Sequence, residues 1–192
     1  GYTEVVQEVM LQHYLPPQFF YLALQESNYK RQIVGPKTRF GIAKGNWQFI
    51  PATAERYGLK TGPLLDTRRF DPKDERFDFH KATAAAASYL RDIYTTEAQA
   101  SGLLVMASYN WGENRVRKLL RKMPENPRQR NFWELIRKHK IPDETYDYVY
   151  YIFSAAVIGE DPKLFGFEFE NPLSVPLQTA NIPRGTAGHG TW

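Results

Sequence analysis

The chain contains no cysteine, and this absence excludes a disulfide framework, a thiol nucleophile and a cysteine-ligated zinc site. No apolar run approaches the roughly 20 residues that a membrane-spanning helix needs, so none is predicted. A basic start followed by an apolar stretch is also missing, so no signal peptide is visible. The chain begins at Gly1 without methionine, and the missing signal therefore does not fix the compartment.

Patterns for metals, cofactors and nucleotides are missing as well. The four histidines are scattered and form no HExxH pair, and Asp66, Asp71, Asp74 and Asp78 do not have the spacing of a calcium loop. No serine lies in a nucleophile elbow, and the glycine-rich segment lacks the ending of a phosphate loop. We therefore expect neither a metal nor a cofactor.

The composition that remains is that of an ordinary globular protein of one domain. Of the 192 residues, 42% are hydrophobic and 24% charged, which excludes disordered and collagen-like chains. The net charge of +4 suits an anionic polymer but does not choose between nucleic acid and cell-wall material. Aromatic residues make up 15%, a content that either builds the core or lines a groove for flat ligands such as sugars.

Periodicity predicts a mainly α fold with at most a small β-hairpin. Apolar spacing and end signals predict helices over residues 2–14, 17–27, 51–57, 79–97 and 103–111, one around residues 116–120, one over 132–139 capped by Asn131, and one capped by Asp143 that ends before Gly159. Residues 33–48 are predicted as a loop or short hairpin, and 61–78 as an irregular connection. The segment 103–109 is apolar almost all round, so we expect it at the centre of an orthogonal helical bundle.

The composition changes after Glu160, where prolines and then glycines accumulate. Alone, such a stretch is typical of a linker. We expect residues 1–160 to form the functional domain and residues 161–192 to form a strap that packs on it.

Glu26 is the first candidate for chemistry. Its spacing from Phe19, Leu22 and Ala23 places it on the apolar face of the second helix, in the final turn. Desolvation and the negative end of the helix dipole both favour a raised carboxyl pKa, as a general acid requires. The alternative is a solvated helix-end glutamate that pairs with Lys30 or Arg31.

Three further segments combine polar and aromatic residues. Trp47 offers a face for stacking and Gln48 offers donors and an acceptor, although a turn with a core tryptophan explains the same residues. Tyr109 and Asn110 close the hydrophobic helix, where they either cap it or bind a ligand. Glu144 and Tyr148 are four residues apart and share a helix face, which in isolation is an ordinary helix start.

Taken in order, these segments resemble the soluble lytic transglycosylase family over about residues 11–159. The motifs are Glu26-Ser27, then Gly45-Asn46-Trp47-Gln48 with Pro51-Ala52-Thr53-Ala54, then Ala107 to Gly112, then Glu144 to Val149. Trp47-Gln48 and the following Tyr57-Gly58-Leu59 are most similar to the membrane-bound D-type branch. Two features depart from the family pattern: Asn46 stands where an apolar residue is usual, and residues 34–40 form an unusual insert.

The resemblance implies a lysozyme-like fold of the goose-type or transglycosylase kind and the enzymatic cleavage of peptidoglycan. The bond cleaved would be the β-1,4 linkage from N-acetylmuramic acid to N-acetylglucosamine, with closure of a 1,6-anhydro ring instead of hydrolysis. Glu26 would act as the single acid and base, assisted by the acetamido group of the substrate. Ser27, Trp47, Gln48, Tyr109, Asn110 and Tyr148 would bind or orient the sugars, and Glu144 would support the wall of the groove.

Alternative functions remain open from the sequence. A goose-type-like muramidase would admit water and release reducing ends, and a non-catalytic glycan-binding module would bind without turnover. A nucleic-acid binder is a third alternative, but the basic run from Arg115 to Lys122 is more typical of a solvated helix face. With the resemblance, we expect a monomeric fragment of a larger cell-envelope protein, periplasmic or envelope-located, that binds glycan strands and no nucleic acid.

Overall fold

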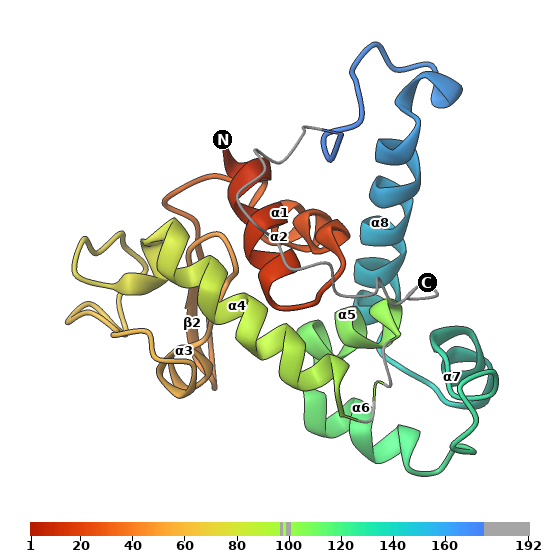
Figure 1. The fold of residues 1–192 in the computed structure, drawn as a ribbon. Coiled ribbons are helices and arrows are strands. Elements are labelled where there is room, and N and C mark those ends of the chain that lie inside the picture. The colour runs from red at the N-terminus through yellow and green to blue at the C-terminus, as the bar shows by residue number, and fades with distance from the viewer. Residues whose placement is uncertain (97, 99–100, 175–192) are drawn as a thin grey trace. The chain divides into compact units, whose positions relative to one another are not determined.

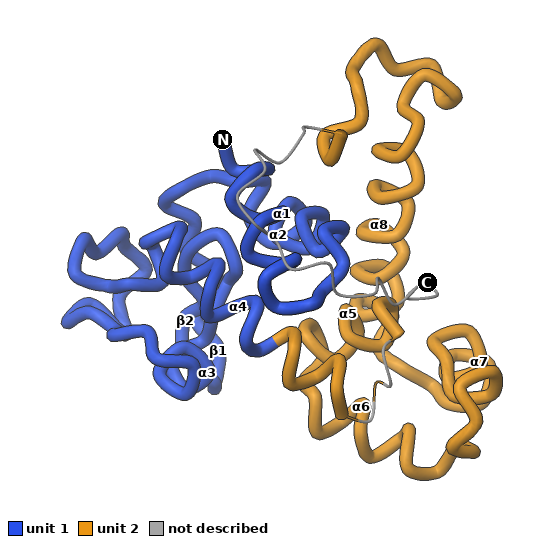
Figure 2. Tube along the Cα trace, viewed as in Figure 1, with its two compact units in different colours: residues 1–89 blue, residues 90–192 orange. Residues whose placement is uncertain are grey.

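The computed structural model describes residues 1–96, 98 and 101–174, and these residues form a mainly α fold with a small β-hairpin (Figure 1). The chain divides into two compact units, Gly1–Tyr89 and Leu90–Trp192, drawn in blue and orange in Figure 2. The predicted fold class is confirmed. The sequence also predicted a boundary at residue 160, between a functional domain and a C-terminal strap. The two compact units do not test that boundary, and it stays a prediction.

The helices and the hairpin that the sequence predicts before residue 90 are all present in unit 1, close to their expected ranges. In order, they are α1 (Tyr2–Gln12), the 3-10 turn η1 (Pro17–Phe19), α2 (Phe20–Ser27), β1 (Val34–Thr38), β2 (Gly41–Lys44), α3 (Pro51–Arg56), η2 (Glu75–Phe77) and the first part of α4 (Phe79–Tyr94). Pro17 and Pro51 both stand at the first turn of a helix, where the missing backbone N–H is no loss.

The predicted loop or hairpin at residues 33–48 is a two-stranded antiparallel hairpin. Its register pairs Lys37 with Ile42 and Thr38 with Gly41, and an irregularity separates these pairs from the pair of Val34 with Lys44. A bulge of this kind bends the strand and re-aims its side chains. The chain leaves β2 directly into Gly45–Gln48, the second motif of the sequence.

Unit 2 is organised around α5 (Gly102–Trp111), whose residues 102–108 are all buried. This helix packs against α6 (Glu113–Leu120) and α8 (Asp143–Glu160). An apolar run with no polar face can be satisfied only by burial on all sides, so the predicted central position holds within this unit. The unit also contains α7 (Phe132–Lys138) and the 3-10 turn η3 (Pro162–Phe165).

The predictions for the ends of α7 and α8 differ in outcome. Asn131 caps α7 as expected, because its Oδ1 accepts a hydrogen bond from the backbone N–H of Glu134 at 2.9 Å. The prediction for α8 was wrong at both ends. Asp143 is the first helical residue after the N-cap Pro142, and the helix continues through the buried Gly159 to Glu160, so this glycine does not end it.

The predicted strap lies partly outside the described residues, since 175–192 are not among them. Within the described part, Asn171 Nδ2 donates to the carbonyl of Glu160 at 3.3 Å, which ties the residues after η3 to the end of α8. No helix of the described residues is long and apolar enough to cross a bilayer.

Candidate active site

Glu26 occupies the position on α2 that its spacing predicted. It lies in the last turn of the helix and is half-buried. Phe19, Leu22 and Ala23 are completely buried and belong to the same helical face. A carboxyl group at the edge of such a face is only partly hydrated.

The backbone immediately after Glu26 has an uncommon conformation. Asn28 and Tyr29 have φ angles of 49° and 53°, both in the left-handed region although neither is glycine. The side chain of Tyr29 holds this turn: its hydroxyl donates to the carbonyl of Phe20 at 2.7 Å, and its ring stacks on Phe20 and on Tyr2. Burial, and then the neighbouring Tyr21, raises the pKa of the Tyr29 phenol, so it remains a donor at neutral pH. Uncommon backbone of this kind persists where surrounding contacts enforce it, often at functional sites.

Ser27 is buried inside the same turn. Its Oγ donates to the carbonyl of Ala23 at 2.9 Å and accepts from the backbone N–H of Tyr29 and from Asn46 Nδ2, both at 3.2 Å. A hydroxyl group has one donor and two acceptor sites, so these three bonds use its full capacity. In this conformation Ser27 therefore holds the turn that follows Glu26, and its predicted contact with sugar remains a prediction.

Gln48 and Trp47, the second motif, have different environments. Gln48 is half-buried with a φ of 48°, and its Nε2 donates to the carbonyl of Gly45 at 2.8 Å. A Cβ added at Gly35 would lie 3.0 Å from Gln48 Oε1. Because glycine has no side chain, the Gln48 amide has room at this position. The orientation of the Gln48 amide is thus fixed by the hairpin.

Trp47 is a core residue. Its exposed fraction is 0%, and its Nε1 donates to Thr83 Oγ1 at 3.0 Å. A fully buried ring presents no face to a sugar, so the predicted stacking role does not agree with this conformation. The alternative of a turn with a core tryptophan describes the observed environment.

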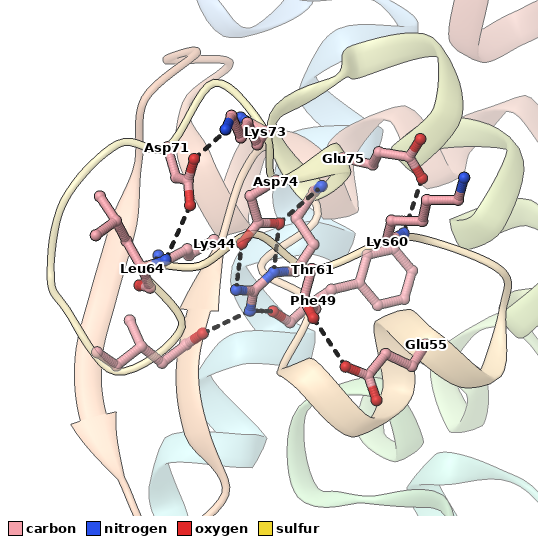
Figure 3. Close-up of polar contacts among 12 residues, drawn as sticks. Lys44, Phe49, Glu55, Lys60, Thr61, Leu64, Asp71, Lys73, Asp74 and Glu75 are labelled. Atoms are coloured by element: carbon pink, nitrogen blue, oxygen red, sulfur yellow. Dashed lines mark hydrogen bonds and ion pairs between the residues drawn. The ribbon is translucent and has the colours of Figure 1, made fainter.

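A buried electrostatic cluster, made of Lys44, Asp71, Asp74 and Arg76, was not predicted (Figure 3). Arg76 donates through Nε and Nη2 to the two carboxylate oxygens of Asp74, at 2.9 and 2.7 Å. Its Nη1 donates to the carbonyls of Ile42 and Phe49, at 2.8 and 3.0 Å. The guanidinium therefore joins the irregular connection of residues 61–78 to β2 and to the segment after it. From the sequence, Lys44 was predicted to lie in the loop or hairpin at 33–48, and the other three residues in the irregular connection at 61–78.

Burial, hydrogen bonds and neighbouring charges together shift the pKa values of Asp74 and Lys44. Burial alone would raise the pKa of Asp74, but the hydrogen bonds and charge of Arg76 outweigh it and the pKa is lowered. Burial lowers the pKa of the Lys44 ammonium, against the attraction of Asp74 and Asp71, and its Nζ donates to the carbonyl of Leu64 at 2.8 Å. Asp71 accepts from the backbone N–H groups of Leu64 and Lys73. The cluster is thus satisfied within the polypeptide.

These contacts narrow the choice of an acid in unit 1. Among the carboxyl groups of residues 1–89, Asp71 and Asp74 are buried, Glu26 and Glu75 are half-buried, and the others are exposed. Hydrogen bonds from Lys81 and from the backbone of Lys60 lower the pKa of Glu75, so this group, like Asp74, is ionised near neutral pH. Glu26 is the half-buried carboxyl that shares a helix face with the completely buried Leu22 and Ala23.

Unit 2 contains the third and fourth motifs. Asn110, near the end of α5, accepts at Oδ1 a hydrogen bond of 2.9 Å from Thr145 Oγ1, in the first turn of α8. Tyr148 is buried one turn further along α8, Tyr109 is half-buried, and Glu144 is exposed. Thr145 was part of a predicted motif but had no predicted role. Thr145 lies four and seven residues before the buried Val149 and Ile152, and this helical spacing is the feature that marks it in the sequence.

Among the described residues, no group of three or more His, Asp or Glu side chains is placed to hold a metal ion.

Comparison with known families identifies the family of this chain. The family model of the Transglycosylase SLT domain matches residues 4–132. The chain belongs to this family. The match includes Glu26, the Gln48 motif and Asn110, whereas Glu144 and Tyr148 lie beyond it. The resemblance predicted from the four motifs is thereby confirmed.

Two relatives of this SLT domain are membrane-bound lytic murein transglycosylase D of Escherichia coli K12 and the protein of the same name from E. coli O6:H1. Each is 32% identical to the chain over 150 residues, which is 73% of this chain and 30% of the relative. The chain thus spans about a third of the length of these relatives. The similarity to the D-type branch agrees with the Trp47-Gln48 sequence.

Proposed function

We propose that this SLT domain is a peptidoglycan lytic transglycosylase that cleaves the β-1,4 bond between N-acetylmuramic acid and N-acetylglucosamine. Family membership supports the reaction class. The observation that carries the proposal is the position of Glu26, half-buried in the last turn of α2 beside completely buried apolar residues. Glycosidases generally use two carboxyl groups, and here one group serves both steps.

In the proposed reaction, the protonated Glu26 carboxyl first gives its proton to the oxygen of the scissile bond. The C1–O bond breaks, the N-acetylglucosamine leaves as an alcohol, and the acetamido group of the muramyl residue supports the positive charge at C1. The Glu26 carboxylate then takes the proton of the muramyl 6-hydroxyl while that oxygen bonds to C1. The carboxyl is regenerated, no water is consumed, and the product ends in a 1,6-anhydro ring.

The remaining motif residues bind and orient the glycan in this proposal. The oxygen of Asn110 is occupied by Thr145, which leaves its amide nitrogen as the group suited to an acetamido carbonyl. The amide nitrogen of Gln48 is held by Gly45, so its Oε1 is suited to accept from a sugar hydroxyl or acetamido N–H. Tyr109 and Tyr148 orient the acetamido group, and Glu144 supports α8 at its first turn.

We further propose that the domain acts on glycan strands in the cell envelope as part of a longer protein. The match covers only 30% of the relative from E. coli K12, which supports the proposal that the domain is part of a longer protein. The modest positive charge of the chain suits an anionic wall polymer.

Digestion of purified sacculi, with the products weighed by mass spectrometry, tests the proposal. We expect muropeptides with anhydro ends, each lighter by one water than its reducing counterpart. Reducing ends would instead identify a goose-type-like muramidase. Binding to sacculi without any released product would identify a glycan-binding module.

Glu26→Gln tests the assignment of the acid. The amide cannot deliver a proton, so we expect release of anhydromuropeptides to fall by at least about a hundredfold while sacculus binding and the thermal midpoint are kept. Glu8→Gln, at an exposed position on α1 of the same unit, is the matched control and should retain turnover. Retained turnover in Glu26→Gln would overturn the assignment.

A further inference from the structure

We propose that Asn46 is a positioning residue for Glu26, acting through Ser27 on the turn that follows α2. This inference rests on the proposed function, because it concerns the orientation of the same carboxyl. It assigns a role to the residue that departs from the family pattern, in which an apolar side chain is usual at this position.

The buried side-chain amide of Asn46 donates two hydrogen bonds. Its exposed fraction is 1%, and its Nδ2 donates to Ser27 Oγ at 3.2 Å and to the carbonyl of Lys30 at 3.4 Å. An amide nitrogen carries two hydrogens, so these two acceptors use both. A buried amide adopts such a position only when its partners compensate for lost water, which makes the pair of acceptors specific.

Both acceptors belong to the segment that closes the end of α2. Ser27 Oγ joins the carbonyl of Ala23 to the N–H of Tyr29, and the N–H of Lys30 donates to the carbonyl of Ser27 at 3.0 Å. Asn46 thus adds a contact from outside the helix to a turn whose Asn28 and Tyr29 are in the left-handed region. Ser27 is the neighbour of Glu26, so the rotation of this last helical turn sets the direction of the carboxyl.

The two residues that precede Asn46 are also fixed by contacts. The N–H of Gly45 donates to the carbonyl of Ile33 at 2.9 Å, and a Cβ on Gly45 would overlap the carbonyl oxygen of Arg76. Lys44, the last residue of β2, belongs to the buried electrostatic cluster. A continuous set of contacts therefore runs from that cluster through β2 and Asn46 to Ser27, and it transmits the position of the hairpin to the turn beside the acid.

Asn46→Leu removes the amide while keeping similar volume. Ser27 Oγ and the Lys30 carbonyl then lose their shared donor, and the turn is free to shift. Because small displacements of a catalytic group reduce turnover strongly, we expect kcat for anhydromuropeptide release to fall about tenfold or more, with KM unchanged. Gln7→Leu makes the same change from amide to leucine at another buried position of unit 1 and should leave kcat within about twofold.

A double-mutant cycle with Ser27→Ala tests the route. If Asn46 acts through Ser27, adding Asn46→Leu to Ser27→Ala will lower kcat much less than it does in the wild-type background. Full additivity of the two losses would overturn the route, and an unchanged kcat in Asn46→Leu would overturn the inference itself. Should Asn46→Leu not fold, Asn46→Ala removes the same donor without adding an apolar branch.

A second measurement does not require turnover and separates this inference from the proposed function. The amides of Tyr29 and Lys30 donate within the turn, so their hydrogen exchange should be at least about tenfold faster in Asn46→Leu than in wild type and in Gln7→Leu. A wild-type protein that releases no anhydro product refutes the proposed function, and the exchange rates then decide the role of Asn46 in the turn. Unchanged exchange at both amides would refute that role.

Discussion

Thr145 donates a hydrogen bond of 2.9 Å to Asn110 across 35 residues of sequence, and this contact joins the third and fourth motifs. Thr145 is almost completely buried and Asn110 half-buried, so the bond is partly buried. It leaves Asn110 with a fixed amide orientation, nitrogen away from Thr145. The pairing explains in physical terms why a threonine follows the glutamate at the start of α8.

Thr145→Val should therefore affect both stability and turnover. Valine has the same shape but no donor, so Asn110 Oδ1 loses its partner and the amide can rotate. We expect the free energy of unfolding to fall by about 1–2 kcal/mol and anhydromuropeptide release to fall about tenfold. Urea denaturation and sacculus digestion measure the two effects. Thr95→Val, at an exposed residue just after α4, is the control, and equal losses in both variants would contradict the assignment.

Gly45 and Gly58 form a matched pair for backbone effects. Both have positive φ, 80° and 84°, but a Cβ on Gly45 would overlap the carbonyl oxygen of Arg76, whereas nothing lies within 4 Å of one on Gly58. Gly58→Ala should lose about 1 kcal/mol of unfolding free energy from backbone strain alone, and Gly45→Ala at least about 3 kcal/mol. Equal values in urea denaturation would show that the close approach of Gly45 to Arg76 is unimportant.

The ion pair between Asp74 and Arg76 predicts how stability depends on acid. The folded pKa of Asp74 lies below its ordinary value of 3.8, so the unfolded chain binds the proton more readily. The stabilisation from this carboxylate is therefore complete above pH 3.8 and is lost as the pH falls through the lower, folded pKa.

Asp74→Asn is the variant that isolates this effect. Since it leaves a buried guanidinium without its counter-ion, we expect a loss of about 3 kcal/mol at pH 7. The difference in unfolding free energy from wild type should narrow as the pH falls below 3.8 toward the lower, folded pKa, because the wild type alone loses the ion pair there. Glu170→Gln, which removes an exposed partner of Lys163, should change little at any pH. A constant difference for Asp74→Asn would contradict the prediction.

Trp47→Phe distinguishes a core tryptophan from a sugar-stacking one. The change removes the indole N–H that reaches Thr83 Oγ1 and part of the buried ring. We expect about 2 kcal/mol less unfolding free energy and an unchanged KM for sacculi. A raised KM with full stability would instead restore the predicted contact with glycan.

The sequence predicted helix positions and the place of Glu26 because both follow from local periodicity. The spacing of Phe19, Leu22 and Ala23 was enough to put Glu26 at the edge of a buried face, as observed. The end of α8 was misjudged at Gly159, because tertiary packing of a buried glycine overrides its low helix propensity.

Contacts between distant segments could not be predicted in this way. Arg76 lay in a segment predicted only as an irregular connection, and only the fold shows that it bonds the carbonyls of Ile42 and Phe49. For Asn46, the sequence showed a departure from the family pattern but not its partner 19 residues earlier. Burial of a polar side chain depends on which segments meet in space, and periodicity contains no information about that.

The bonds from Asn46 to Ser27 and Lys30 also have a consequence for the order of assembly. A nascent chain can wind α2 as soon as its residues are made, but the helix end stays incomplete until the hairpin and residue 46 have followed. Lengthening the insert at residues 34–40 would increase the entropy lost when that contact closes, though only slowly with length. Changes in the length of this insert should therefore be tolerated more readily than a change that breaks the hydrogen bonds of Asn46.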